Sequence, residues 1–335
     1  MTSCYFCKES VHQSIIPGLP DDLALRCLAM VSHGYHGLLE TVSKTWRDLI
    51  RNLDYANYKA REEWCGNWLF VLTEGSNNEW VAYDPEADRW HPLPKIPTVH
   101  ADWKHFGFSM LFVVKFMLLG GRNLSCIRGL ALAEVYDPVA DKWEELPPMR
   151  NPQMDCLGLS YKGKFHVLSD QVGLPDQNTS EVFSPSDGTW RTVEDIWPFS
   201  RAMQFAVQVI GDNRVYTVVD WGESLIKTRD TEKGEWYNIG SVPSVNLPDH
   251  SRQLEAFGYG FAALRHELYV LGGKALKWEQ SGAGRFDIVK LGLVRVCNPL
   301  VKPLKWRETR PMVESARGTV IGCASMEEES SIFPR

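Results

Sequence analysis

Hydrophobic positions follow two different patterns along the chain. From residue 64 onward they form short apolar runs bounded by turn residues, as in "KFMLLGG" (115–121), "LGLSYKG" (157–163) and "ELYVLGG" (267–273). Runs of this length between turn residues are typical of antiparallel strands that are joined as hairpins. The larger part of the chain is therefore predicted to be β-sheet.

Residues 15–51 instead carry apolar side chains at helical spacing. The string "LPDD" at 19–22 suits a helix start, because Pro is tolerated in the first turn and acidic residues favour a helix N-terminus. Two apolar faces follow, and Gly34 separates them. The first face holds Leu23, Leu25, Leu28 and Val31, and the second holds Leu38, Leu39, Val42, Trp46, Leu49 and Ile50. Two or three short helices are predicted.

The connecting segment 52–64, "NLDYANYKAREEW", contains no Pro or Gly and is rich in helix formers toward its end. Tyr55, Tyr58 and Glu62 recur at i, i+3 and i+7, so one face of a helix can pack. We expect a helix that runs directly into the following domain, in place of a flexible tether.

One string recurs within the β-rich part. "VYDPVADKWEELPPMR" at 135–150 matches "AYDPEADRWHPLP" at 82–94, and weaker copies begin at 183, 229 and 297. The five copies place Trp at 90, 143, 190, 236 and 306, at intervals of 53, 47, 46 and 70 residues. A period near 50 residues indicates a solenoid or a propeller, and the last interval contains an insertion.

Each unit of the repeat predicts four strands. Pro138 fixes φ and lacks an N–H, so the third strand ends there, while Asp137 can hydrogen-bond the turn backbone. Trp143 lies on the fourth strand and offers a large surface to a neighbouring sheet. Paired glycines at 120–121 and 272–273 allow a tight turn where a Cβ would clash.

The first unit is incomplete at its start, and the chain supplies a matching piece at its end. "WLFVLTEG" (68–75) is a second strand with no first strand before it, whereas "ARGTVIGCAS" (316–325) is a first strand with nothing after it. The simplest arrangement puts both in one sheet, which closes a ring and removes a sheet edge. We predict five blades, or six if the insertion at 274–296 supplies extra strands.

The repeat resembles the kelch motif, in which a double Gly is followed by a Tyr and then a Trp. The resemblance covers 64–325 and implies a mainly β fold, a kelch-type β-propeller with four-stranded blades. It is strong in the second and fifth units. The third unit has Ser169-Asp170 in place of the double Gly, and the fourth has Asp220-Trp221 there and Arg229 in place of the Tyr.

The helical segment resembles an F-box, in its Leu-Pro start, its acidic and apolar first helix, and its Val-Ser-Lys-x-Trp string followed by Leu. This resemblance implies docking on a Skp-type adaptor and, through it, on a cullin–RING ubiquitin ligase. Tyr35-His36 departs from the family pattern, and Val42 and Trp46 are alternatively part of the F-box core. The implied adaptor-binding residues are Leu19, Pro20, Leu23, Leu28, Val31, Leu38, Val42 and Trp46.

Together the two motifs resemble plant-type F-box/kelch proteins, which implies a substrate receptor that binds a target protein for ubiquitylation and is not itself an enzyme. The alternative is a non-catalytic kelch scaffold without ubiquitin transfer. The predicted divisions are a disordered N-terminus at 1–14, the F-box and connecting helix at 15–63, the propeller at 64–325 and an acidic tail at 326–335.

Charge and cysteine content restrict the partners and the compartment. The formal net charge of −6 provides no basic field for nucleic acid or an anionic membrane. The most apolar stretch, at 106–121, is too short to span a bilayer and contains Lys115. No secretory signal is visible, and eight scattered cysteines suit reduced thiols in the cytoplasm or the nucleus.

Two groups of metal-binding residue types are set aside, and no cofactor is predicted. Cys4, Cys7 and His12 make at most part of a zinc site, which needs four ligands. His100, Asp102 and His105 are interpreted as a solvated loop between blades. The histidines are otherwise dispersed, and no P-loop, Rossmann or Ser-His-Asp fingerprint is present.

Long loops of the propeller are the expected substrate surface, because loops on a rigid scaffold usually carry the binding residues. Loops at 92–104, 122–131, 192–201, 241–254 and 274–287 carry Trp and Arg, the residue types enriched in binding hot spots. The candidate substrate-binding residues are Trp103, Arg122, Arg128, Trp197, Arg252, Trp278 and Arg285.

Overall fold

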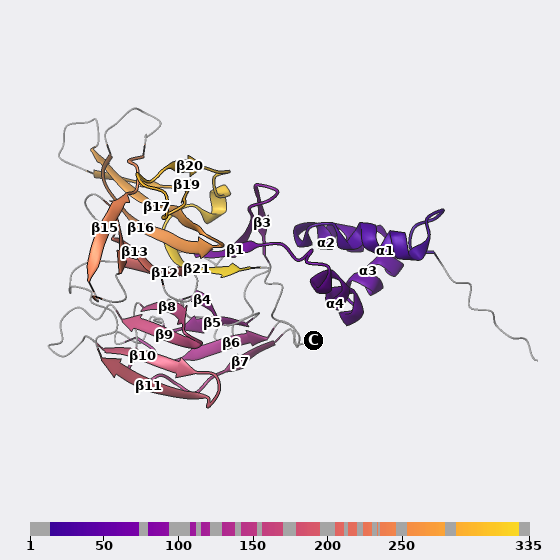
Figure 1. The fold of residues 1–335 in the computed structure, drawn as a ribbon, viewed down its shortest axis with the longest axis horizontal. Helices are drawn as coiled ribbons and strands as arrows, with labels where there is room; N and C mark the ends of the chain where they lie inside the picture. The colour runs from indigo at the N-terminus through magenta and orange to yellow at the C-terminus, as the bar shows by residue number, and fades with distance from the viewer. Residues whose placement is uncertain are drawn as a thin grey trace, which may run out of the picture. The chain divides into compact units, whose positions relative to one another are not determined.

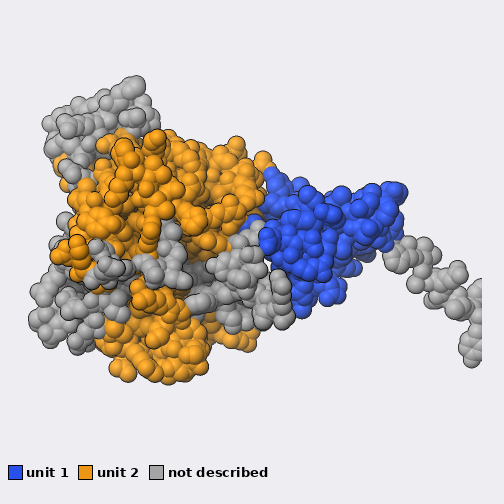
Figure 2. All heavy atoms as spheres, viewed as in Figure 1, with its two compact units in different colours: residues 1–66, 328–335 blue, residues 67–327 orange. Residues whose placement is uncertain are grey.

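The structure is a computed structural model, and its chain divides into two compact units. Unit 1 comprises residues 1–66 with 328–335, and unit 2 comprises residues 67–327 (Figure 2). The residues described are 14–73, 80–93, 108–111, 115–120, 129–137, 142–152, 156–169, 179–194, 205–210, 214–219, 224–229, 233, 235–245, 253–278 and 286–327. Residues 1–13 of the segment predicted to be disordered (1–14), most of the acidic tail, and both sets of metal-binding residue types lie outside these ranges.

Unit 1 is helical, as the apolar spacing predicts. Its first helix starts directly after Pro20, and Asp21 and Asp22 occupy the first turn. The Asp21 carboxylate also accepts a hydrogen bond from the Ile15 backbone N–H at 3.0 Å, which ties the preceding chain to the helix. The elements are α1 (Asp21–Ala29), η1 (His33–Tyr35), α2 (His36–Val42), α3 (Lys44–Ile50) and α4 (Leu53–Arg61).

The second apolar face belongs to two helices and not to one. Ser43 adopts an extended conformation with φ −154° between α2 and α3, and its side chain accepts a hydrogen bond from the Trp46 N–H at 3.0 Å. Ser is a favoured N-cap because its hydroxyl satisfies one of the free N–H groups at a helix start. This break turns Leu38 and Val42 toward solvent, whereas Trp46 packs against the core of unit 1.

Unit 2 consists of five antiparallel sheets in its described residues. The first sheet has the order β21 (Val320–Met326), β1 (Trp68–Thr73), β2 (Trp80–Asp84) and β3 (Arg89–Pro92). The second contains β4 (Phe108–Leu111), β5 (Lys115–Leu119), β6 (Ala133–Asp137) and β7 (Lys142–Glu145). The third contains β8 (Cys156–Tyr161), β9 (Lys164–Ser169), β10 (Thr179–Ser184) and β11 (Thr189–Glu194).

The last two sheets continue the same strand order. The fourth contains β12 (Phe205–Ile210), β13 (Arg214–Val219), β14 (Leu225–Arg229) and β15 (Trp236–Ser241). The fifth contains β16 (Gln253–Leu264), β17 (Glu267–Trp278), β18 (Phe286–Lys290), β19 (Val294–Cys297) and β20 (Trp306–Glu308), and η3 (Glu314–Ala316) follows it. Neighbouring sheets meet through their first strands in the order β21, β4, β8, β12, β16 and back to β21, as in a propeller (Figure 1).

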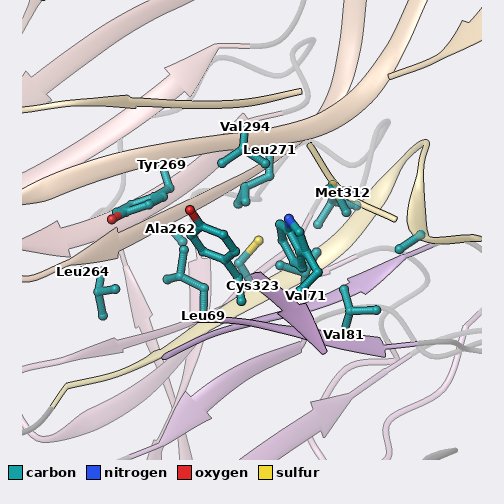
Figure 3. Packing of buried hydrophobic residues seen from close by; sticks show 14 of the residues in the cluster. Leu69, Val71, Val81, Ala262, Leu264, Tyr269, Leu271, Val294, Met312 and Cys323 are labelled. Atoms are coloured by element: carbon teal, nitrogen blue, oxygen red, sulfur yellow. The ribbon is translucent and has the colours of Figure 1, made fainter. Parts of the chain in front are cut away.

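The first sheet is completed by the end of the chain, which confirms the predicted closure. Strand β21 pairs antiparallel with β1, from Trp68 opposite Met326 to Thr73 opposite Val320. The junction between the first and fifth sheets is an apolar cluster in which Leu69 and Val71 lie near Ala262, Leu271 and Cys323 (Figure 3). Because β21 occupies the edge of β1, the ring leaves no open strand there.

The recurring aromatic and Trp form a cross-strand pair in each of the first three sheets. Tyr83 lies opposite Trp90, Tyr136 opposite Trp143 and Phe183 opposite Trp190. Their ring centroids are 4.8, 5.4 and 5.1 Å apart, within the range of favourable aromatic pairs. All three Trp side chains are buried, as expected for residues that fill the gap between sheets.

The same Trp also joins neighbouring sheets by a hydrogen bond. Trp190 Nε1 donates to the Pro147 carbonyl at 2.7 Å, and Trp90 Nε1 donates to the Arg310 carbonyl at 3.0 Å. Each acceptor lies four residues after the Trp of the preceding sheet. The repeat thus carries both the apolar contact and the polar contact that position one blade on the next.

The insertion at 274–296 extends the fifth sheet and forms no sixth one among the described residues. Strand β17 does not end at the double Gly but continues to Trp278, where β18 pairs with it. Gly272 and Gly273 have φ of +59° and +89°, and a Cβ on Gly272 would lie 2.9 Å from the Gly318 carbonyl oxygen. The glycines therefore allow a close approach within a long strand, and much of the loop expected at 274–287 is strand.

Candidate functional site

Unit 1 holds five of the ten exposed large apolar side chains of the described residues. The exposed fractions are 46% for Leu23, 61% for Met30, 67% for Leu38, 61% for Val42 and 61% for Leu53. Leu38 and Val42 lie one turn apart on α2 and therefore share one face of it. A small helical unit that leaves these residues outside its own core offers an apolar surface to a protein partner.

The other residues that the F-box resemblance implies divide between surface and core. Pro20 is exposed, and Leu19 and Val31 are half-buried. Leu28 is buried, and Trp46 packs against the same core and donates from Nε1 to the Ile15 carbonyl at 2.7 Å. Both side chains are thereby engaged inside unit 1. Met30 and Leu53 are exposed residues that the apolar spacing did not single out.

Helix α4 holds the C-terminal end of α1 through two buried polar side chains. Lys59 is fully buried, and its Nζ donates to the carbonyls of Ala29 and Val31, each at 2.6 Å. Tyr55, also buried, donates from its hydroxyl to the Leu28 carbonyl at 2.9 Å. The last carbonyls of a helix lack partners within it, and a cation there also interacts favourably with the helix dipole.

Burial around this network shifts two pKa values. Burial raises the pKa of Tyr55 to about 12, so the phenol stays protonated and able to donate. Burial and the positive charge of Lys59 lower the pKa of His36 to about 4, so its imidazole is neutral at pH 7. His36 Nε2 lies 3.4 Å from the Tyr55 hydroxyl. These contacts connect α4 with the end of α1 and with the start of α2.

The substrate-binding candidates fall almost entirely outside the described residues. This applies to Trp103, Arg122, Arg128, Trp197, Arg252 and Arg285. Trp278 is the last residue of β17, in register with Phe286 of β18. Trp278 therefore belongs to a strand and not to the loop in which it was expected.

The exposed large apolar residues of unit 2, within the described chain, form two groups. Phe286 and Ile288 on β18 are 51% and 60% exposed. Leu300 and Val301, in the connection between β19 and β20, and Tyr237 on β15 form the other group, in which Lys302 Nζ lies 5.6 Å from the Tyr237 ring centroid.

Reactive and metal-binding features are sparse in the part of the chain that the structure describes. It contains no group of three or more His, Cys, Asp or Glu side chains that could hold a metal ion. Burial raises the pKa of the Cys297 and Cys323 thiols to about 12, which keeps them protonated and unreactive. Of the described helices, none has the length and apolarity needed to cross a membrane.

A helical F-box-like unit and a propeller of five antiparallel sheets, as the described residues show them, define the class of protein. The F-box domain family matches residues 16–57, and the Kelch motif family matches residues 116–150. The chain belongs to the F-box/kelch-repeat proteins, since it is 60% identical to F-box/kelch-repeat protein At1g16250 of Arabidopsis thaliana across 96% of this chain and 99% of the relative.

Two more distant similarities are also found. F-box/kelch-repeat protein SKIP30 of Arabidopsis thaliana is 25% identical across 96% of this chain and 99% of its own length. A solved structure titled "Structure of YjhT" aligns with a TM-score of 0.41 and 13% identity, over 68% of this chain and 69% of that one. The alignment with At1g16250 spans 380 positions, more than the 335 residues of this chain, so it includes positions that this chain lacks.

Proposed function

We propose that this chain is the substrate-recognition subunit of a Skp–cullin–F-box ubiquitin ligase. In this proposal the F-box docks on the Skp-type adaptor and the propeller binds the target protein. The observation that carries it is the exposed apolar surface of unit 1. This surface includes Leu23, Leu38 and Val42, which lie within the residues that match the F-box family. We assign Leu28 and Trp46 to the core that supports this surface.

The test separates docking from folding because it uses residues that the unit's own core does not need. Leu38→Ser combined with Val42→Ser in the full chain should abolish binding of a purified Skp-type adaptor, since truncating an apolar anchor costs about 2–4 kcal/mol in a packed interface. Leu300→Ser is the matched control, because Leu300 is 55% exposed but belongs to unit 2. Undiminished adaptor binding by the double variant would contradict the docking surface.

The competing function is a kelch scaffold that binds partners without ubiquitin transfer. Reconstitution with adaptor, cullin, RING subunit, ubiquitin-activating enzyme and ubiquitin-conjugating enzyme distinguishes the two. A receptor should support ubiquitylation of a protein tethered to its propeller, whereas a scaffold should not. The double variant on α2 should lose this activity while the control retains it.

A further inference from the structure

The five repeat units give an internal comparison that sets one surface of unit 2 apart. In four units the residue after the repeated Trp is polar or charged, whereas the fourth unit has Tyr237 there, and 48% of this side chain is exposed. The polar residues at this position are His91, Glu144, Arg191 and Arg307. A single exposed aromatic is ordinary on a protein surface, so the neighbouring unit decides whether Tyr237 is part of a larger surface.

The neighbouring fifth unit departs from the repeat as well, in the connection between β19 and β20. Trp90 lies seven positions after Tyr83, and the next three units keep this spacing, whereas Trp306 lies nine positions after Cys297. The connection 298–305, "NPLVKPLK", therefore holds two extra residues. It is also apolar and basic, whereas the first unit has "DPEADR" in this turn, with three acidic residues.

The exposed apolar residues of this connection are not needed to make the turn. Asn298 Oδ1 accepts a hydrogen bond from the Leu300 N–H at 2.9 Å, in the same way as Asp84 Oδ1 accepts from the Glu86 N–H at 3.0 Å. Short polar side chains start turns in this manner. The side chains of Leu300 and Val301 take no part in this bond, and they are 55% and 41% exposed. The connection thus presents two apolar side chains to solvent from a turn whose start is fixed.

The two departures from the repeat meet where the fourth sheet packs against the fifth. Lys302 Nζ lies 5.6 Å from the centroid of the Tyr237 ring, within the range of a cation–π contact. Leu304 of the same connection packs against β15, because a Cβ on Gly240 would lie 2.6 Å from Leu304 Cδ1. The exposed residues at this junction form a surface that we call the seam patch: Tyr237, Leu300, Val301 and Lys302.

The charge of the seam patch and its surroundings selects the partner. Lys302 and Lys305 are exposed, and no carboxylate in the part of the chain that the structure describes forms an ion pair with either. Glu235 is exposed two positions before Tyr237, so the two lysines outnumber the nearby acidic residue. Opposite charges across an interface favour the matching partner. An acidic segment would complement this surface.

Two other occupants fit the charge less well. The chain as a whole is negative, with a formal net charge of −6, so it offers no wider basic field for nucleic acid or an anionic membrane. A second copy placed on the same patch by a two-fold axis would bring Lys302 close to its own counterpart. A local acidic segment of another protein is therefore favoured.

We propose that the seam patch binds an acidic segment of the target protein, with large apolar side chains of that segment on Tyr237 and Leu300 and a carboxylate beside Lys302. The apolar contacts supply affinity, and the lysine selects for charge. This inference rests on the proposed function, because it names the surface by which a receptor would hold its target.

The test selects random peptides displayed on phage against the immobilised full chain. The library is first depleted on the folded double variant Tyr237→Ser with Leu300→Ser, which makes the selection specific for the seam patch. Compared with the depleted library, the enriched peptides should be more acidic and richer in Leu, Ile, Phe and Trp. A fluorescent copy of the most enriched peptide gives a dissociation constant by anisotropy, and replacing its acidic residues by Lys should weaken binding about tenfold or more.

Three single variants and two controls connect the binding to the seam patch. Tyr237→Ser and Leu300→Ser should each weaken the acidic peptide about tenfold or more, as expected when an apolar interface residue is truncated. Lys302→Glu should reverse the preference between the acidic peptide and its Lys copy. Ile288→Ser and Lys290→Glu change exposed residues of β18 outside the patch and should leave both affinities unchanged. Matched thermal melts establish that the variants are folded.

Specific outcomes overturn the proposal. They are a selection that enriches no peptide, enriched peptides that are no more acidic than the depleted library, or an affinity that Lys302→Glu leaves unchanged. Dimerisation in analytical ultracentrifugation that Leu300→Ser removes would identify a second copy as the occupant instead. Binding to vesicles of anionic phospholipid that Lys302→Glu removes would identify a lipid surface instead.

Adaptor binding, measured on the same samples, separates this proposal from the ligase role. Leu300→Ser should lose the peptide and keep the adaptor, whereas the double variant at Leu38 and Val42 should lose the adaptor and keep the peptide. A parent chain that binds the peptide but no adaptor would contradict the ligase role alone. A parent chain that binds the adaptor but selects no acidic peptide would contradict the seam patch alone.

Discussion

Replacing Lys59 by Met should loosen the C-terminal end of α1. Lys59 is fully buried and donates to the carbonyls of Ala29 and Val31, each at 2.6 Å. Met preserves much of the volume but no donor, and a buried carbonyl left without a partner costs about 1–3 kcal/mol. Relief from burying a charge offsets part of that cost. We expect a net loss of about 2–4 kcal/mol of local stability.

Hydrogen exchange of residues 21–31 in the full chain measures this loss. An opening free energy lowered by about 2–4 kcal/mol should speed exchange by roughly thirty- to a thousandfold, since about 1.4 kcal/mol corresponds to a factor of ten. Lys44→Met is the matched control, because Lys44 is an exposed lysine at the start of α3. Exchange in Lys59→Met within threefold of the parent would refute the idea that this lysine holds α1.

A second readout is electrostatic. The charge of Lys59 contributes to lowering the pKa of His36, after the larger effect of burial. Lys59→Met should therefore raise the pKa of His36 above about 4 in an NMR titration. Looser packing would raise this pKa as well, because burial is its larger cause, so the titration is compared with the hydrogen exchange of residues 21–31. An unchanged pKa of His36 in the folded variant would contradict the presence of the Lys59 charge beside it.

Three further predictions concern the closing strand, a buried histidine and the cysteines. Deleting 314–335 should expose the edge of β1 and yield an aggregation-prone chain. Deleting 328–335 should leave the melting temperature unchanged. Equal melting temperatures for the two truncations would exclude a structural role for β21. Burial lowers the pKa of His166 to about 4. As the pH falls from 6.5, His166 is therefore protonated in the unfolded chain before it is protonated in the folded chain. The free energy of unfolding should fall by up to about 3 kcal/mol between pH 6.5 and 4. The melting temperature of His166→Leu should depend less on pH across that range than that of the parent. An unchanged dependence on pH would contradict this assignment. Iodoacetamide should label exposed Cys27 in the folded chain and spare Cys297 and Cys323, as mass spectrometry of the native and the denatured protein can show.

Repeat architecture was predictable from the sequence because its signals are local and recur. The strand before each Asp-Pro or equivalent turn, the Trp strand after it and the closure by 316–325 all depend on short apolar runs and on one missing strand. The predicted end of a strand at Gly272-Gly273 was wrong, because glycine permits a turn but does not enforce one. Strands β16 and β17 stay paired past this point, with Tyr259 opposite Gly272 and Phe257 opposite Lys274.

The helical unit shows where spacing alone is insufficient. A regular apolar face cannot distinguish one helix from two, and Ser43 divides it by accepting the Trp46 N–H. Lys59 carries no sequence signal for burial, since a lysine on a polar helix is ordinarily exposed. Its partners lie about 30 residues earlier and are backbone atoms, which have no residue identity that a sequence pattern could show.

The same reason applies to the contacts between blades. Two residues before the aromatic of the third strand, Glu181 is buried and accepts from the N–H groups of Arg150 and Asn151, each at 2.7 Å. At the equivalent position of the fifth sheet, buried Arg295 instead places Nη2 3.4 Å from the Ser244 carbonyl. One repeat position thus holds opposite charges, because the preceding connection presents donors in one case and an acceptor in the other. The neighbouring blade decides whether an acidic or a basic side chain is needed at this position. Aligning the repeats with one another therefore shows the residue type as varying but does not show why it varies.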